Sequence, residues 1–277
     1  MKLSERLNTV VSFVKPGSRV ADVGTDHGYV PIELAKRGII THGLAMDVRK
    51  GPLERAKEHI RQYGLEDVIE TRLSDGISKM QDHEADTVIV AGMGGELVIH
   101  ILEEGRRFWD QIDHWILSPQ SELDKVRDYL AEQGFAIERE TMLKEEGKYY
   151  VVMDVVRGQM SPLKPWESLY GPLLLKEKHP VLAELLEKEK ALCESILKGL
   201  AGEGGLFVPT AIPALDIDLD DLAKMTYQET AYAVMSRFLT DFTEEELKNC
   251  INAAYDSKFD TEEIAPLVSA DGAYYLE

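Results

Sequence analysis

Residues 19–31 place the strongest constraint on how this chain folds. A short apolar run ends at Asp22, passes through a glycine-containing turn at residues 24–28, and continues into a helical pattern near Ile32. A strand, a tight glycine turn and a helix form the first unit of a nucleotide-binding α/β domain. Glycines are expected there because a side chain would keep a ligand away from the backbone amides at the helix start.

The spacing of the glycines separates the possible ligand classes. Relative to Asp22, glycines stand at positions +2 (Gly24) and +6 (Gly28), and Asp26 occupies +4. The dinucleotide fingerprint Gly-x-Gly-x-x-Gly is therefore absent. An acidic residue followed by glycines at +2, +4 and +6 resembles the S-adenosylmethionine loop of class I methyltransferases, here with the middle glycine replaced.

The pattern that follows predicts a seven-stranded sheet. Further strands are expected at residues 42–47, 68–73, 86–91 and 114–117, and a closing hairpin at 135–143 and 149–156. The intervening periodicity predicts helices, and the apolar run at 86–91 suits the middle of a parallel sheet. Nicotinamide-binding domains normally lack such a hairpin, so the predicted fold class is an α/β, Rossmann-like class I methyltransferase with one antiparallel strand.

The pattern changes after Pro165. Helices are expected at 172–179 and 181–200, with Leu182, Leu185, Leu192 and Ile196 at coiled-coil spacing. Two antiparallel helices that pack on each other or on the domain are the interpretation. Further helical segments are expected at 227–239 and 244–255. The predicted domains are a methyltransferase domain at 1–160, a helical hairpin or coiled coil at 161–198, and a mostly helical tail at 199–277.

Composition limits the cellular setting and the partners. The chain has 277 residues, two cysteines, no signal-like start and no apolar run of membrane-spanning length, so a cytoplasmic protein without a membrane partner is expected. The seven histidines show no metal-ligand spacing, and no metal is expected. The net charge of −19 gives no support to a nucleic-acid partner, but −11 of it falls in residues 205–277 and only −7 in residues 1–160.

Several residues are candidates for binding the methyl donor. Asp22 is expected to orient the loop and to hold the methionine ammonium through backbone or water, or only to stabilise the turn. Asp47 ends the second strand, where a carboxylate accepts both ribose hydroxyls, or it caps the next helix. Asp75 is expected beside the adenine amino group or at a helix start. The predicted donor-binding residues are Asp22, Gly24, Thr25, Gly28, Asp47 and Asp75.

A second group of residues is expected to face the methyl acceptor. The glycine-rich segment after the fourth strand would let a planar substrate approach the backbone, or would be only a flexible connector. Asp26, His27 and Tyr29 are expected where the methyl group emerges, although each has an alternative structural role. The predicted catalytic residues are Asp26, His27, Tyr29, Gly92, Met93 and Gly94. Arg37, Arg49 and Arg55 are candidates for phosphate contacts or for solvated surface.

Four motifs together resemble the bacterial tRNA (adenine-22-N1)-methyltransferase family. They are Ala-Asp-Val-Gly-Thr-Asp-His-Gly-Tyr-Val-Pro at 21–31, Ala-Gly-Met-Gly-Gly at 91–95, Leu-Ser-Pro-Gln at 117–120 and Glu-Glu-Gly-Lys-Tyr-Tyr at 145–150. The resemblance covers about residues 1–190. It implies S-adenosylmethionine as the donor and N1 of one adenosine in the tRNA D-arm as the acceptor.

The tail resembles a different family, the N-terminal portion of threonine synthase. The similar segments include 204–209, 239–247, 255–267 and 272–277. In that family the lysine that holds pyridoxal phosphate lies beyond this point, so the resemblance implies that the tail does not bind this cofactor productively. The chain is interpreted as a fusion, by genomic event or assembly error, with its junction near 190–200.

Three alternatives remain open. The enzyme could transfer methyl to a small molecule or a protein, which stimulation by tRNA would distinguish. The chain could instead be a non-catalytic cofactor-binding or interaction protein, which would bind the donor without turnover. A nicotinamide oxidoreductase is opposed by both the glycine spacing and the hairpin.

Overall fold

The computed structural model describes residues 3–198, 213–222, 224–255, 267–270 and 273–276. The chain divides into two compact units, residues 1–191 and residues 192–277.

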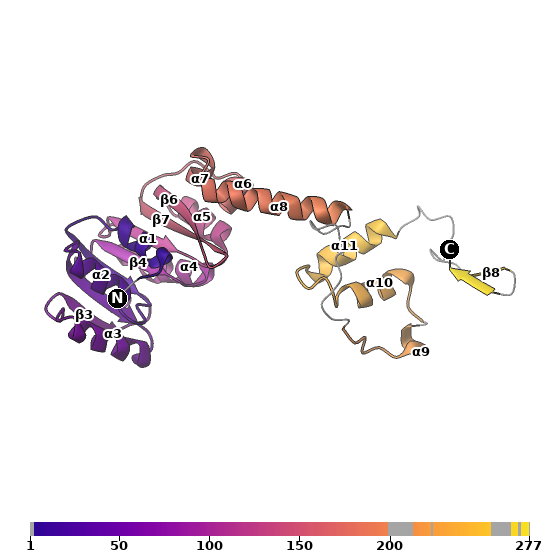
Figure 1. Cartoon of the computed structure of the whole chain (residues 1–277), viewed down its shortest axis with the longest axis horizontal. Coiled ribbons are helices and arrows are strands. Elements are labelled where there is room, and N and C mark those ends of the chain that lie inside the picture. Colours follow the sequence, from indigo (N-terminus) through magenta and orange to yellow (C-terminus); the bar gives the residue numbers. More distant parts are fainter. Residues whose placement is uncertain (1–2, 199–212, 223, 256–266, 271–272, 277) are drawn as a thin grey trace. The chain divides into compact units, whose positions relative to one another are not determined.

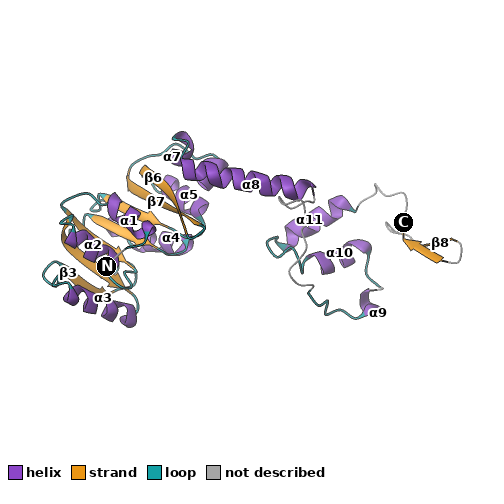
Figure 2. Cartoon of the chain, in the orientation of Figure 1, coloured by secondary structure: helices purple, strands orange, loops and turns teal. Residues whose placement is uncertain are grey.

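A seven-stranded sheet forms the centre of the first unit (Figure 2). Its order is β3-β2-β1-β4-β5-β7-β6, in which β7 runs antiparallel to both of its neighbours. The predicted seven-stranded, Rossmann-like sheet with one antiparallel strand is therefore confirmed. The strands are β1 (Ser18–Val23), β2 (Ile40–Asp47), β3 (Ile69–Leu73), β4 (Thr87–Ala91), β5 (His114–Ser118), β6 (Phe135–Glu145) and β7 (Lys148–Arg157).

Helices cover both faces of this sheet (Figure 1). The alternating side chains of the strands divide into clusters: Val20 and Ile89 pack with residues of α1 and α2, whereas Val88 and Val90 pack with residues of α4 and α5. The central strand β4 is buried on both faces, as the continuous apolar run predicts. The helices of this layer structure are α1 (Glu5–Phe13), α2 (Tyr29–Lys36), α3 (Lys50–Gln62), α4 (Gly95–Glu104) and α5 (Leu123–Glu132).

The closing hairpin is tighter than predicted. The sequence suggests a five-residue loop at 144–148, but β6 and β7 stay paired as far as Glu145 and Lys148. Glu146 and Gly147 both have positive φ, at 50° and 79°. This two-residue turn follows the right-handed twist of the flanking strands, so the pairing continues to the end of the hairpin.

The helical extension consists of α6 (Pro165–Tyr170), α7 (Pro172–Lys176) and α8 (Pro180–Lys198). The predicted helix at 172–179 ends early, before Lys178, which has a φ of 52°. Leu182 is buried and Leu185 half-buried against the sheet cluster, whereas Leu192 is 49% exposed. The first half of the predicted seam thus packs on the domain. The side chain of Ile196 lies outside the described residues.

A buried ion pair fixes this extension to the sheet. The Arg127 guanidinium on α5 lies 2.8 Å from Glu140 Oε1 on β6, and both side chains are fully buried. Arg127 also donates to the carbonyl oxygens of Ser168 and Leu169 on α6, at 2.6 Å and 3.0 Å. These contacts leave the charged pair well satisfied, as a buried pair requires.

The second unit contains α9 (Leu219–Leu222), α10 (Tyr227–Met235), α11 (Glu244–Ala254) and the hairpin strands β8 (Leu267–Ala270) and β9 (Ala273–Leu276). Both longer helices begin at capping boxes, Thr226 with Glu229 and Thr243 with Glu246. The hairpin pairs antiparallel and was not predicted for this mostly helical tail. Of the predicted junction at 190–200, residues 199 and 200 lie outside the described residues, as do residues 256–266 of the tail. No helix in the described ranges has the length and apolarity needed to span a bilayer.

We expect limited proteolysis to remove the second unit before it cleaves the first. Among the described residues of the second unit, Leu247 and Ile251 are the buried hydrophobic side chains, whereas Phe238, Leu239 and Phe242 are more than a third exposed. A small apolar core stabilises a fold weakly, so the second unit should open locally more often than the first and expose cleavage sites. Mass spectrometry of a dilute-trypsin digest should show an intact fragment near residues 1–191. Early cleavage within the sheet, with the tail intact, would contradict this expectation.

Candidate functional site

A pocket of about 390 Å³ opens at the carboxyl ends of β1 to β4. The chain order reverses between the adjacent strands β1 and β4, and ligands of open α/β sheets bind at such a switch point. Six of the twelve predicted site residues line the pocket: Gly24, Asp26, Asp47, Asp75, Gly92 and Met93. The other six, Asp22, Thr25, His27, Gly28, Tyr29 and Gly94, lie outside its lining.

Asp47 presents its carboxylate at the end of β2. The residue is only 5% exposed, and its Oδ1 accepts a hydrogen bond from the Arg49 backbone amide at 2.8 Å. The Arg49 guanidinium lies 3.8 Å away on the open side. A carboxylate fixed in this way retains acceptor capacity for a diol, since each oxygen has two lone pairs.

Asp22 is buried beneath the loop and shapes it. Its Oδ2 accepts a hydrogen bond from Thr25 Oγ1 at 2.6 Å, which places both residues behind the pocket wall. Burial raises the pKa of Asp22 to about 6; the Thr25 hydrogen bond opposes this shift, and the nearby Asp47 charge adds to it. The geometry favours the loop-orienting role over a direct contact with a ligand.

The raised pKa of Asp22 predicts a pH-dependent stability for the first unit. Between about pH 4 and pH 6 the folded chain binds a proton that the unfolded chain releases, so the free energy of unfolding falls as pH rises through this window. The full effect is about 3 kcal/mol for a shift from 3.8 to about 6. Asp22→Asn, which keeps an acceptor for Thr25, should flatten this dependence.

Urea unfolding followed by tryptophan fluorescence measures the effect in the first unit, because all three tryptophans lie within residues 1–191. Asp82→Asn removes an exposed carboxylate and serves as the matched control. The same pH slope in wild type and Asp22→Asn would contradict the prediction.

Gly28 allows a close approach between the loop and α3. Its φ is 71°, and a Cβ built on it would lie 3.2 Å from the Cβ of the buried Ala56 on α3. Its amide donates to the Thr25 carbonyl oxygen at 2.9 Å. The left-handed turn therefore lets α3 pack closely against the loop, which positions the residues on either side of Gly28.

Asp26 lies at the rim of the pocket with a half-exposed carboxylate. Its Oδ1 accepts a hydrogen bond from Arg55 Nη2 on α3 at 2.7 Å, and His27 Nε2 lies 3.5 Å from Oδ2. Arg55 thus orients the carboxylate through Oδ1. The other oxygen, Oδ2, has only the weak contact with His27 and remains available to solvent or a ligand.

His27 and Tyr29 form an aromatic cluster with His59, which the sequence did not single out. The His27 and Tyr29 rings lie 4.9 Å apart at 11°, and His59 lies 5.5 Å from each. His59 Nδ1 also bonds the His27 carbonyl oxygen at 2.9 Å. The Tyr29 ring packs against the apolar cluster of α1 and α2, so its predicted role in stacking on a base competes with a packing role.

The segment after β4 is tied to the loop after β5. The Gly92 amide donates to the Ser118 carbonyl oxygen at 3.1 Å, and the Gln120 amide donates to the Met93 carbonyl oxygen at 2.8 Å. The Met93 side chain lines the pocket and reaches Gly24, since a Cβ built on Gly24 would lie 2.1 Å from Met93 Cε. Gly94 turns away from the pocket, and a Cβ there would lie 3.0 Å from Ser121 Oγ.

Asp75 lines the pocket, and the helix that it was proposed to cap does not form at residues 76–80. Ser74 stabilises this turn instead: its Oγ accepts from the Lys79 amide at 3.1 Å and donates to the Gly76 carbonyl oxygen at 3.0 Å. The Asp75 side chain is therefore available to a ligand.

The pocket also contains residues that the sequence reasoning missed. They are Ser74, Leu97, Ile101 and Val48, and they line it together with Arg49, which the sequence suggested for phosphate contacts. Leu97 and Ile101 are four residues apart on α4, a spacing that any helix facing a core shows. The spacing of apolar residues alone therefore cannot distinguish a helix face that lines a pocket from one that is buried in the core.

His114, Glu138 and Asp154 form a cluster whose ligand atoms lie within 4.8 Å of one another. The cluster lies at the start of β5, at the sheet edge opposite the pocket. His114 Nδ1 already bonds Asp154 at 2.7 Å, and Arg139 lies 3.5 Å from the same carboxylate. These two contacts pair the Asp154 carboxylate with neighbouring side chains.

Known proteins match the two parts of the chain separately. A family model described as "Threonine synthase N terminus" matches residues 186–255, and threonine synthase of Saccharomyces cerevisiae is 37% identical over 79 residues. That match covers 27% of this chain and 15% of the yeast protein. The predicted resemblance of the tail is thus confirmed.

A family model described as "Methyltransferase domain" matches residues 3–153. The tRNA (adenine(22)-N(1))-methyltransferase of Bacillus subtilis is 32% identical over 206 residues, which cover 73% of this chain and 87% of that protein.

Solved structures agree with this match. The Streptococcus pneumoniae protein described as a proposed tRNA (m1A22) methyltransferase, in complex with S-adenosyl-L-methionine, superposes with a TM-score of 0.67 at 37% identity. The match covers 72% of this chain and 92% of that chain. The B. subtilis m1A22 tRNA methyltransferase structure gives a TM-score of 0.65 at 27% identity, covering 90% and 98% of the two chains. The chain therefore belongs to the tRNA (adenine(22)-N(1))-methyltransferase family.

Proposed function

We propose that this protein transfers a methyl group from S-adenosylmethionine to N1 of adenosine 22 in tRNA. The observation that carries the proposal is the pocket at the switch point, which places Asp47, Asp75 and the Gly92-Met93 segment around one space. The donor and acceptor are those named for the family members that match over most of the first unit.

The residues of the pocket fit the parts of the donor. The buried Asp47 carboxylate is suited to accept both ribose hydroxyls in a charge-assisted, bidentate contact. Asp75, at the end of the neighbouring strand, would accept from the adenine amino group, and Leu97 and Ile101 would contact the ring. Gly24 with its short turn would border the methionine part, with Asp22 and Thr25 holding the loop from behind.

The donor supplies an electrophilic methyl group on a sulfonium centre. Adenine N1 has a free lone pair at neutral pH, so no strong base is needed. The N1 lone pair forms the new bond to carbon as the carbon–sulfur bond breaks, and the positive charge moves onto the base. Catalysis then requires mainly that N1 is held in line with the methyl group and that the new charge is stabilised.

We propose that Asp26 stabilises that charge. Its carboxylate lies at the pocket rim, and Arg55 orients it through Oδ1. We propose that it accepts from the exocyclic amine of the target adenine. Gly92 and Met93 would border the base, while Tyr29 would stack on it after it leaves its pair.

A comparison of acceptors tests the reaction class. Unmodified bacterial tRNA should stimulate incorporation of labelled methyl, whereas bulk protein and small nucleosides should not. Methyl transfer that is indifferent to tRNA would favour another acceptor. Donor binding without turnover on any RNA would favour the non-catalytic alternative. The cytoplasmic location and the lack of pyridoxal phosphate binding by the tail remain predictions.

A further inference from the structure

The guanidinium of Arg6, on the first helix, lies beside the loop that would receive the target base. A Cβ built on Gly92 would be 3.5 Å from Arg6 Nη1 and 3.7 Å from Gln120 Nε2. The Arg6 guanidinium carbon lies 5.5 Å from the centre of the Tyr150 ring on β7. Arg6 and Gln120 thus both lie beside Gly92, and Arg6 also lies near the Tyr150 ring.

Contacts of its own backbone hold Arg6 in this place. The amide of Glu5 donates to Glu145 Oε1 at 2.5 Å, and the amide of Arg6 lies 3.4 Å from Oε2 of the same carboxylate. The end of the β6–β7 hairpin therefore anchors the start of α1. The backbone contacts with Glu145 therefore set where the Arg6 guanidinium lies, and no ion pair of the guanidinium is needed to hold it there.

The charge of Arg6 has no counterpart in the described part of the chain. Within the described residues no ion pair joins the Arg6 guanidinium to a carboxylate, and its Nη1 atom is buried without a hydrogen-bond partner. The three arginines that the sequence suggested for phosphate contacts are different, since Arg37, Arg49 and Arg55 each face a carboxylate. Arg6 as a whole is half-buried, but a charged donor atom that is buried without a partner is costly, so a ligand anion is the expected partner of Nη1.

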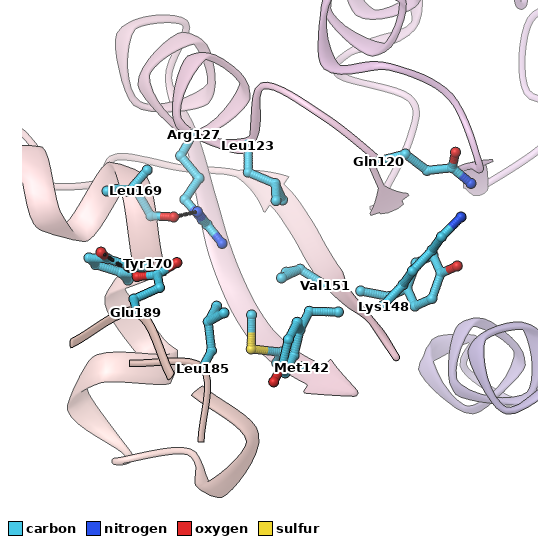
Figure 3. A pocket seen from close by; sticks show the side chains of 12 residues that line it. Gln120, Leu123, Arg127, Met142, Lys148, Val151, Leu169, Tyr170, Leu185 and Glu189 are labelled. Atoms are coloured by element: carbon cyan, nitrogen blue, oxygen red, sulfur yellow. Dashed lines mark hydrogen bonds between the residues drawn. The ribbon is translucent and has the colours of Figure 1, made fainter. Parts of the chain in front are cut away.

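A second cavity lies next to Gln120 and Tyr150, and it indicates the side from which a ligand anion would reach Arg6. A groove of about 560 Å³ lies between the hairpin and α8, and Gln120, Lys148, Tyr149 and Tyr150 line it. Gln120 and Lys148 stand at one end of this groove, away from Tyr170 and Glu189 (Figure 3). Lys148 also has no carboxylate of the described residues within 4.0 Å. Arg6 shares Tyr150 and Gln120 with this groove and does not line the donor pocket.

We propose that Arg6 binds a backbone phosphate of the RNA next to the target adenosine, with Gln120 and Lys148 beside it, so that this end of the groove is the acceptor side of the site. A guanidinium is suited to a phosphate because its planar donors match two oxygens. Such a contact would fix the register of the strand and carry no sequence information. The proposal rests on the proposed function, because it requires an RNA substrate.

The test measures binding of unmodified tRNA by fluorescence anisotropy at several salt concentrations, with S-adenosylhomocysteine present, using the full chain. Arg6→Gln should weaken tRNA binding about tenfold at low salt and reduce the slope of log K against log salt by about one, as for one lost phosphate contact. Arg6→Lys should keep the slope. Lys15→Ala removes an exposed charge beyond the other end of the same helix and should change neither value.

Donor affinity separates the two possible anions. Binding of S-adenosylhomocysteine to Arg6→Gln should stay within about twofold of wild type. A tenfold loss of donor affinity with an unchanged salt slope would assign Arg6 to the donor carboxylate and overturn the proposal. If a folded Arg6→Gln variant shows an unchanged salt slope while wild type still methylates adenosine 22, the Arg6 proposal is overturned and the proposed function stands. A changed slope in a protein that does not methylate adenosine 22 would support Arg6 and contradict only the proposed function.

Discussion

Replacement of Asp47 by alanine should reduce the affinity for S-adenosylmethionine by about 100-fold or more. The carboxylate is buried, held by the Arg49 amide, and faces the pocket at the end of β2. Two charge-assisted hydrogen bonds to a ribose diol contribute about 1.5–3 kcal/mol each, and every 1.4 kcal/mol changes the dissociation constant tenfold. Isothermal titration of donor and product into the variant measures the loss directly.

Two further variants make this result specific. Asp47→Asn keeps the size and one acceptor, so it should lose roughly tenfold in affinity, the part that depends on charge. Asp82→Ala removes an exposed carboxylate outside the pocket and should bind the donor as wild type does. Wild-type donor affinity in a folded Asp47→Ala protein would show that the ribose lies elsewhere.

Replacement of Asp26 should reduce turnover far more than donor affinity. We expect kcat to fall about 100-fold, the size typical of removing one preorganised electrostatic group, and the donor dissociation constant to change less than about threefold. The reason is the position of the carboxylate at the rim, where it would meet the charge that develops on the base. Single-turnover methyl transfer at saturating donor separates this chemical effect from binding.

The choice of substitution matters because Asp26 has a φ of 47°. Asparagine tolerates this left-handed conformation better than alanine, so Asp26→Asn separates loss of charge from backbone strain. Arg55→Ala keeps the carboxylate and removes only the group that orients it, and should lower kcat about tenfold. A collapse of donor affinity in Asp26→Asn would place Asp26 in the donor site instead.

The sequence predicted the sheet because its signals are local. The apolar run of β4 and the glycine turn after β1 each predict their own element, whereas the order of the strands is set by the tertiary fold. The sequence predicts a loop of five residues where the structure has a two-residue turn at Glu146 and Gly147, because the charged residues around the turn are typical of an open loop. The turn is short because both residues adopt positive φ. Glycine allows this conformation readily, but neither residue type requires it.

The site was only partly predictable, for a physical reason. Residues at strand ends, such as Asp47 and Asp75, are placed by the sheet, so their meeting in one pocket follows from topology. The pairing of Asp26 with Arg55 depends instead on how α3 rotates against the loop, which the packing of Gly28 on Ala56 decides. Arg6 gave no signal, because nothing in its own segment indicates that its charge lacks a partner.

Methyl transfer to defined tRNA transcripts tests the central claim most directly. Labelled S-adenosylmethionine is supplied with unmodified bacterial tRNA that carries either adenosine or guanosine at position 22. We predict label in the adenosine transcript alone, recovered as 1-methyladenosine after digestion. Equal label in both transcripts, or none in either while the donor still binds, would contradict the assignment of adenosine 22 as the acceptor.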